Sequence, residues 1–189
     1  MKKTTLFLIS ITGIVACSKH EVTPSTEFTL QSEAVASGKL LDAFKCETKI
    51  LDVEKSIPLS WSNVPASTGS LAIVMYHYPN PDDHSKDPNT YLFLWNINPS
   101  VLKIEHGAAG DGPWYMGPNK DHTAISYTSP CSPSSGTHHY IIKLYALNKT
   151  PGSFPAKSTL DMTWTDFQTG IGSVSTIGTA TLEFDSITN

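Results

Sequence analysis

The stretch "IPLSWSNVPASTGSLAIVMY", residues 57–76, contains the segment that decides the fold. From residue 69 to residue 78 the side chains alternate along an extended chain so that both faces are apolar, and His77 falls on the same face as Met75. A strand that is apolar on both faces is typical of the centre of a sheet. The sequence therefore predicts a central β-strand over residues 69–78.

Three further segments have the same extended character. They are "NTYLFLWNI" (89–97), "HYIIKLYAL" (139–147) and the shorter "TATLEF" (179–184). The segments between the strands are rich in proline, glycine and other turn-forming residues, at 79–89, 107–113 and 129–136. Many short strands divided by such loops favour a mainly β fold, and we expect one β-sandwich domain.

One short helix is expected near the C-terminus. Thr159 is a suitable N-cap, and Asp161 would lie in the first turn, where its charge suits the helix dipole. Apolar side chains recur at helical spacing at Leu160, Trp164 and Phe167, and glycines follow at positions 170 and 172. The pattern predicts a helix that begins after Thr159 and ends at these glycines.

The N-terminal segment has the layout of an export signal. Lys2 and Lys3 precede an apolar run that ends at Ala16 and is too short to span a bilayer stably. Cys17 follows directly, and "IVAC" resembles the lipobox of bacterial lipoproteins, in which the cysteine is acylated. We expect a lipoprotein signal peptide at 1–16, lipidated Cys17 with a flexible tether at 17–27, and a folded domain at 28–186. The alternative is an ordinary secretory signal in which Cys17 is not modified.

Lipidation would fix the location of the protein. The acyl chains would anchor it in a bacterial cell envelope, on the periplasmic side of a membrane. Ser18, which follows the cysteine, is compatible with sorting to the outer membrane. The membrane is therefore an expected partner through the N-terminal lipid.

The charge of the chain excludes one class of partner. The sequence has 13 lysines, no arginine and 17 acidic residues. Loss of Lys2 and Lys3 with the signal leaves 11 lysines against 17 acidic residues, a net charge of −6. Nucleic-acid binding needs clustered cations, so we expect no nucleic-acid partner. The lack of arginine also excludes bidentate clamping of an anion by a guanidinium.

Two cysteines remain in the predicted domain, Cys46 and Cys131. In an oxidising envelope compartment two such cysteines commonly pair, and the closed loop would contribute about 4–5 kcal/mol by the chain-entropy estimate. Two free buried thiols and a pair of metal ligands are the alternatives. A disulfide would fix the loop around Cys131 beside the histidines that follow it.

Four blocks of sequence, taken in order, resemble one known family. Residues 57–76, "LWNINPS" (94–100) and "SPCSPSSGTHHYIIKLYAL" (129–147) are similar to signatures of the phosphatidylethanolamine-binding protein family, and Cys46 sits where bacterial members often have the partner of the loop cysteine. This is the family of Raf kinase inhibitor protein, and the likeness is to its bacterial YbhB/YbcL branch. The resemblance covers residues 28–186. It implies an antiparallel Greek-key sandwich with a short C-terminal helix and a small pocket that in relatives holds phosphate, acetate or a phospholipid head group.

The resemblance also implies which residues form the pocket. His138 and Tyr140 match the histidine and tyrosine that follow the cysteine loop in relatives, and they lie two apart on one strand, facing the same way. His77 stands where relatives have an aspartate, and Tyr91 where they have a second-strand histidine. We expect a ligand-binding pocket formed by His77, Tyr91, Pro130, His138 and Tyr140. Trp114, in the loop-like stretch "GDGPWYMGPN" (110–119), either belongs to the core or stacks on a ligand.

The residue types in this pocket favour a small anionic or polar ligand. The imidazoles of His77 and His138 would become cationic near pH 6–7, and the hydroxyls of Tyr91 and Tyr140 would donate hydrogen bonds. Affinity for an anion should then rise as pH falls. We expect a non-catalytic binding protein that needs no cofactor.

Three alternatives use the same residues. A metal site would need a third ligand besides His77 and His138, such as His84, His106 or His139. A hydrolase would pair His138 with Ser129, Ser132 or Ser134, although the chain has no G-x-S-x-G elbow. A protein-interaction module, like the kinase-inhibitor relatives, would leave the pocket vestigial. The opposite face of the strand from His138 carries His139, which is expected to be solvated.

Overall fold

The computed structural model describes residues 26–46 and 55–188. The predicted signal peptide and lipidated Cys17 lie outside the described residues. The first strands are β1 (Thr29–Gln31), β2 (Val35–Ala36), β3 (Lys39–Leu40), β4 (Leu59–Ser62), β5 (Ser70–His77) and β6 (Asn89–Ile97), with a short 3₁₀ helix, η1 (Asp42–Phe44), after β3. They are followed by β7 (Lys103–Ile104), β8 (Tyr115–Met116), β9 (Gly136–Leu147), helix α1 (Trp164–Gly172) and β10 (Thr176–Thr188).

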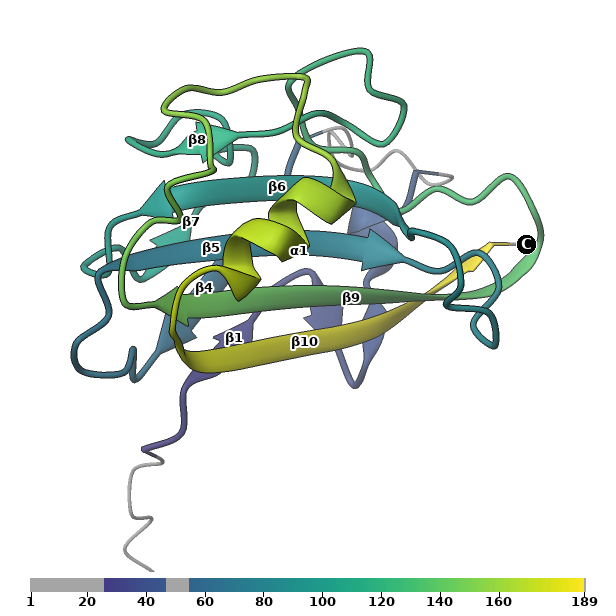
Figure 1. The fold of residues 1–189 in the computed structure, drawn as a ribbon. Helices are drawn as coiled ribbons and strands as arrows, with labels where there is room; N and C mark the ends of the chain where they lie inside the picture. The colour runs from purple at the N-terminus through teal and green to yellow at the C-terminus, as the bar shows by residue number, and fades with distance from the viewer. Residues whose placement is uncertain (1–25, 47–54, 189) are drawn as a thin grey trace, which may run out of the picture.

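The strands form two sheets, as Figure 1 shows. The larger sheet has the order β2-β3-β10-β9-β5-β6-β8, and the smaller has the order β1-β4-β7. All pairings are antiparallel except the contact between β3 and β10, where Lys39 lies opposite Asp185 in parallel. The prediction of a mainly β, antiparallel sandwich with one short helix near the C-terminus is confirmed.

Strand β5 lies inside the larger sheet, between β9 and β6. All its residues are buried. Leu71, Ile73 and Met75 belong to the core between the two sheets, while Ala72 and Val74 belong to a second core on the other face. The prediction of a central strand with two apolar faces is confirmed, and its cause is burial on both sides.

Different elements cover the two faces of the larger sheet (Figure 1). The smaller sheet packs on the inner face through Leu30, Leu59 and Ile104. Helix α1 packs on the outer face, where Phe167 and Ile171 join the second core. The molecule therefore has three layers, and the pocket expected from the sequence lies at one end of the layer between the sheets.

Two strands are longer than the sequence patterns predict. Strand β9 begins at Gly136 rather than at residue 139, and β10 covers Thr176–Thr188 rather than 179–184. β10 pairs with β9 along nearly its whole length. Its outward side chains are exposed and mostly polar, so an apolar pattern identifies only its middle.

The helix begins later than predicted. Its N-cap is Thr163, whose hydroxyl accepts a hydrogen bond from the Asp166 amide, so the prediction that Thr159 is the cap is wrong. The Thr159 amide donates to the Met116 carbonyl, and its hydroxyl accepts from the Asp161 amide, which holds this segment in a turn beside β8. Gly170 lies within the helix and packs so closely on Phe154 that a Cβ there would overlap the ring.

A disulfide joins Cys46 and Cys131, whose Cα atoms are 5.7 Å apart. The predicted pairing is confirmed, and the alternatives of free thiols or metal ligands are excluded for these two residues. Within residues 26–46 and 55–188, none of the helical segments has both the length and the apolar character needed to cross a membrane.

Candidate binding site

His77 occupies the last position of β5 and points into the layer between the two sheets. Its residue surface is only 7% exposed. The Nδ1–H group donates to the main-chain carbonyl of His139, 2.9 Å away, because a carbonyl oxygen can only accept. The ring stacks on Tyr140 with the centroids 4.9 Å apart. These contacts fix both the orientation and the tautomer of the neutral imidazole.

His138 approaches His77 from β9. The two ring centroids are 5.6 Å apart. His138 is also held by the main chain, because its Nε2–H group donates to the Ser134 carbonyl at 2.9 Å. The structure thus brings together the two histidines that the sequence analysis placed in one pocket, although they are 61 positions apart in the chain.

Tyr140 packs against His77 in the core. Its side chain is fully buried and lies between His77 and Phe184, with the Phe184 ring centroid 5.5 Å away. The Tyr91 ring meets Tyr140 edge-on at 5.2 Å. Tyr140 therefore positions His77 and Tyr91 and does not itself line the cavity.

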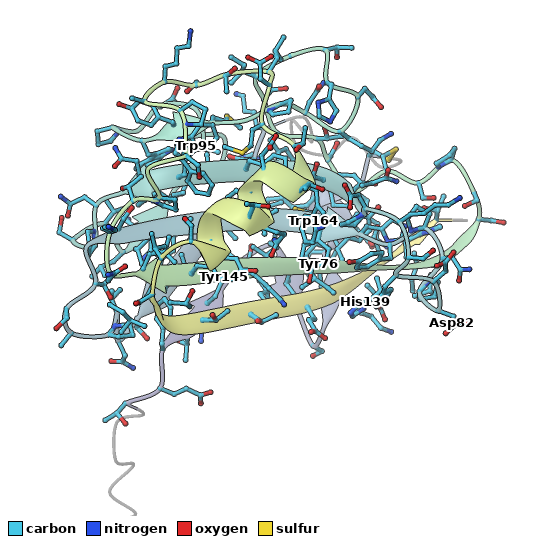
Figure 2. The ribbon with its side chains drawn as sticks, viewed as in Figure 1. Tyr76, Asp82, Trp95, His139, Tyr145 and Trp164 are labelled. Carbon is cyan, nitrogen blue, oxygen red and sulfur yellow. A yellow bond between two sulfur atoms is a disulfide. The ribbon has the colours of Figure 1, made fainter. Side chains whose placement is uncertain are left out.

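A cavity of about 260 Å³ opens beside the two histidines. Its lining comes from the end of β5 and the start of β6, from the loop before β9 and the first part of β9, and from one lysine in the loop after β8. The lining residues are His77, Pro79, Asn89, Tyr91, Lys120, Cys131, Ser132, Pro133, Ser134 and His138. The cavity lies at the end of the sandwich where Figure 2 labels His139 and Asp82, away from Trp95.

Besides Tyr140, two predicted lining residues lie outside the lining. Pro130 is buried beneath the loop, outside the lining. Trp114 packs against the core between the sheets, and its Nε1–H group donates to the Ala109 carbonyl at 2.7 Å. Of the two roles considered for Trp114, the structure favours the core position. The ligand-binding roles of His77, Tyr91 and His138 stay predictions.

The most important residue missed by the sequence analysis is Lys120. Its amide donates to the Thr128 hydroxyl at 2.9 Å, and the preceding Asn119 side chain accepts from the amides of Thr123 and Ala124. This compact turn carries the lysine to the cavity. Asn89 and the serines of the loop were also missed. No regular spacing relates any of them to the histidines, so the sequence holds no signal that would group them.

The protonation states differ from those expected. Burial lowers the pKa of His77, and the neighbouring rings of His138 and His139 lower it further, against the opposing effect of the hydrogen bond to the His139 carbonyl. The pKa of His77 therefore lies below the ordinary value on which the expected charge near pH 6–7 was based. Burial raises the pKa of the Tyr91 hydroxyl, and the hydrogen bond to Asp121 raises that of the Lys120 ammonium. At neutral pH Tyr91 keeps its proton, and the Lys120 ammonium, which donates to Asp121 Oδ1 at 2.8 Å, places a cation at the cavity.

The three histidines considered as a third metal ligand have separate partners. His84 stacks on Tyr78, His106 meets Phe44 edge-on, and His139 lies on the outer surface with Nδ1 3.0 Å from the Asp185 carboxylate. In the described part of the chain, no three histidine, cysteine, aspartate or glutamate side chains are grouped so that they could hold a metal ion.

The serines of the loop are not arranged as activated nucleophiles. The hydrogen bond of His138 goes to the main-chain carbonyl of Ser134 and not to a hydroxyl. The Ser132 and Ser134 hydroxyls lie 3.1 Å from each other. Ser129 is buried. A nucleophilic serine would instead share its hydroxyl proton with an imidazole base.

Comparison with known proteins agrees with this geometry. The sequence profile of the family described as "Phosphatidylethanolamine-binding protein" matches residues 31–177. The chain belongs to the phosphatidylethanolamine-binding protein family. The UPF0098 protein of Methanothermobacter thermautotrophicus is similar to it, with 32% identity over 130 residues that make up 66% of this chain and 79% of that protein.

Two solved structures of the family share the fold. A phosphatidylethanolamine-binding protein homologue from Chlamydia trachomatis has a TM-score of 0.70 at 24% identity, over 87% of this chain and 100% of that chain. Escherichia coli YbcL has a TM-score of 0.69 at 22% identity, over 86% of this chain and 99% of that chain. These likenesses show that the fold is shared.

Proposed function

We propose that the protein is a non-catalytic binding protein whose cavity takes a small anion or an anionic head group of the phospholipid type. The observation that carries this proposal is the position of Lys120, a cation in a cavity that also contains the protonated hydroxyl of Tyr91. A charge-assisted hydrogen bond from the ammonium and a neutral one from the phenol suit an oxygen anion. Family membership supports a binding role of this kind.

The size and position of the cavity support a small ligand or the end of a larger one. Its volume of about 260 Å³ is near the lower limit of ordinary ligand sites, which begin at about 300 Å³. Lys120 and the loop residues around Ser132 are partly exposed, so a ligand reaches them from solvent. A phosphate or acetate ion, or one head group with its chains outside, matches this size.

A binding role without catalysis agrees with the contacts of His138. Its Nε2–H group is committed to a main-chain carbonyl, and the nearby serine hydroxyls are paired with each other. We therefore expect no turnover of ester substrates. Turnover that disappears in a Ser132→Ala or His138→Ala variant would contradict this part of the proposal.

The second part of the proposal concerns location. We infer from the lipobox-like "IVAC" that Cys17 is acylated and that the domain is held at a membrane of the bacterial envelope. Expression of the full chain with Cys17→Ser should move the protein from the membrane fraction to the soluble fraction. Mass spectrometry of the N-terminal peptide should find acyl chains on Cys17, and an unmodified cysteine in the membrane fraction would contradict the inference.

Calorimetric titration of the full chain tests the binding proposal. Phosphate, acetate and glycerophosphoethanolamine are the probes, and we expect at least one of them to bind. Lys120→Met should weaken that binding by about tenfold or more, because a hydrogen bond from a charged donor is lost. Lys157→Met is the matched control, since Lys157 is an exposed lysine outside the lining. Silence from all three probes, or equal affinity in the Lys120 variant, would overturn the proposal.

A further inference from the structure

The disulfide ties one wall of the cavity to a distant part of the chain. Four consecutive lining residues, Cys131, Ser132, Pro133 and Ser134, belong to the loop that precedes β9. Cys131 is bonded to Cys46, which lies 85 positions earlier, just after the short helix η1. One covalent bond therefore connects the loop that lines the cavity with the N-terminal part of the domain.

The other bonds of this loop are local. Within residues 26–46 and 55–188, the segment 130–135 has no main-chain hydrogen bond to another main-chain group. The Ser134 carbonyl accepts from the His138 ring four positions away, and the Ser132 and Ser134 hydroxyls lie 3.1 Å apart. These bonds do not fix the loop against a distant element. The disulfide does so, and its cleavage would leave the loop held by its own ends and by packing.

The two cysteines of the bond differ in their access to solvent. Cys131 is an exposed residue and lines the cavity, whereas only 9% of Cys46 is exposed. Among the described residues that line the cavity there is no aspartate or glutamate, so an incoming thiolate meets no carboxylate in the lining. In thiol–disulfide exchange a thiolate attacks the sulfur that it can reach, and the other sulfur leaves. Cys131 is therefore the sulfur open to attack, and Cys46 is the leaving group.

We propose that Cys131 is a thiol-exchange site, through which a dithiol reductant releases the wall of the cavity and lowers its affinity for a ligand. A thiolate of the reductant attacks Cys131 Sγ and forms a mixed disulfide, while the Cys46 sulfur leaves as a thiolate and takes up a proton. The second thiolate of the reductant then attacks the reductant's own sulfur in the mixed disulfide, and Cys131 leaves and is protonated in turn. Two electrons pass from the dithiol to the protein, and the reductant ends as a disulfide.

The inference rests on the proposed function, because it describes how ligand binding in the same cavity is regulated. A bound ligand and the intact disulfide both favour the loop in its observed position. Their effects are therefore coupled, and the coupling is reciprocal. At equilibrium the ligand protects the disulfide from reduction by the same factor by which the disulfide strengthens ligand binding. A fitting reductant carries two thiols close together, as a C-x-x-C motif does.

Trapping with a monothiol identifies the sulfur that is attacked. The protein is the full chain with Cys17→Ser, so that Cys46 and Cys131 are its only cysteines. It is exposed briefly to glutathione at about pH 8, where thiols are partly ionised, and is quenched with excess N-ethylmaleimide. Peptide mass spectrometry should find glutathione on Cys131 and maleimide on Cys46, in about tenfold or greater excess over the reverse product. Equal amounts of the two products, or glutathione mainly on Cys46, would overturn the assignment.

A second measurement distinguishes exchange on the folded protein from exchange after unfolding. The disulfide is reduced with dithiothreitol at increasing guanidinium concentrations that all lie below the unfolding transition. Attack on an exposed sulfur needs no unfolding, so the rate should follow the dithiothreitol concentration and change little with denaturant. A rate that rises steeply with denaturant would overturn the proposal, because the sulfur would then be reached only in unfolded molecules.

Calorimetric titration with inorganic phosphate measures the effect on the cavity. The reduced protein should bind about tenfold or more weakly than the oxidised protein, because binding must then order the loop. The double variant Cys46→Ser with Cys131→Ser is the control, and dithiothreitol should leave its affinity unchanged. Near-ultraviolet circular dichroism reports whether the reduced protein stays folded.

The outcomes separate the inference from the proposed function. Equal affinity of the oxidised and reduced proteins would overturn the switch and leave the proposed function in place, as would unfolding of the whole domain on reduction. Failure of the oxidised protein to bind any of the proposed probes would overturn the proposed function and with it the effect on affinity. The trapping and rate measurements decide the exchange site at Cys131 in either case.

Discussion

Aromatic rings cover both faces of the larger sheet, but the two aromatic layers have different surroundings at their ends. On the outer face Phe167 of α1 lies 5.3 Å from both Phe93 and Phe154, and the Trp95 Nε1–H group donates to the Pro155 carbonyl at 2.8 Å. Figure 2 shows Trp164, Tyr76 and Tyr145 around the helix on this side. Every ring of this layer meets another part of the protein, so the layer is closed.

The inner face carries a comparable row of rings that stops at a cavity. Phe184, Tyr140 and His77 stack in sequence, and His77 ends the row with one nitrogen unpaired by the described residues. The comparison teaches that aromatic packing alone does not distinguish core from site. The distinction lies in the polar surroundings: in the outer layer the Trp95 Nε1–H group donates to a main-chain carbonyl, whereas at the end of the inner row His77 lines the cavity.

The largest expected effect comes from a substitution in the aromatic layer between α1 and the larger sheet. Phe167→Ala removes a fully buried ring from between Phe93 and Phe154 and should lower the free energy of unfolding by about 3–5 kcal/mol. Denaturant unfolding measures this loss. The molecules that remain folded should bind phosphate with unchanged affinity, and a loss below about 1 kcal/mol would contradict the assignment of this layer as core.

Removal of the disulfide should affect the end of the layer between the two sheets, where the cavity lies. Cys131 lines the cavity, and within the described residues the segment 130–135 has no main-chain hydrogen bond to another main-chain group. The double variant Cys46→Ser with Cys131→Ser should lose about 2–5 kcal/mol of stability and should also bind anions more weakly, because the loop that carries Ser132 and Ser134 is released. Unfolding experiments and calorimetry measure the two effects. Full retention of anion affinity would show that the loop keeps its position without the disulfide.

Acid should weaken the fold through the inner layer. Because burial lowers the pKa of His77, the unfolded chain binds a proton below about pH 6.5 that the folded chain does not bind, so stability falls as pH decreases from there towards the folded pKa. His77→Phe should reduce this loss between pH 6.5 and 5.5 by up to about 1 kcal/mol. Denaturant unfolding of the wild type and of His77→Phe at pH 7.5, 6.5 and 5.5 measures this difference. The charged neighbours His138, His139 and Lys120 are the same in both proteins. Identical slopes would contradict the buried, neutral state of His77.

The smallest effect is expected outside both layers. His139→Gln removes an exposed pair with Asp185 and should change stability by less than about 1 kcal/mol. The main-chain carbonyl that accepts from His77 is kept in this variant. Its phosphate affinity should equal that of the wild type, and a large loss would place the His139 side chain in the site.

The sequence predicted the regular parts of this molecule well. The two-sided strand β5 and the pairing of Cys46 with Cys131 were correct, because burial on both faces and the small number of cysteines leave few other arrangements. The boundaries of α1 and β10 were less accurate. Thr159 forms a local turn that competes with capping, and β10 presents polar residues on its exposed face, so neither pattern identifies the true end.

The site was predicted only in part. His77 and His138 are brought together by the pairing of β5 with β9, and it was the family resemblance that predicted a shared pocket for them. Lys120 enters from a loop whose turn depends on the side chain of Asn119, and no periodicity reports such a position. The lowered pKa of His77 depends on its burial and neighbours, which the type of residue alone does not specify.

The connection between β5 and β6 has a consequence for which ligands can enter. Its two ends, Pro79 and Asn89, line the cavity, and its middle is attached by the stacking of His84 on Tyr78 and by the hydrogen bond from the Thr165 hydroxyl to Asp87. A change in the length of this connection would therefore move part of the cavity lining while the paired strands stay in place. Shortening or extending the connection by a few residues would change the size of the ligand that the cavity can admit, while the side chains contributed by the strands stay the same.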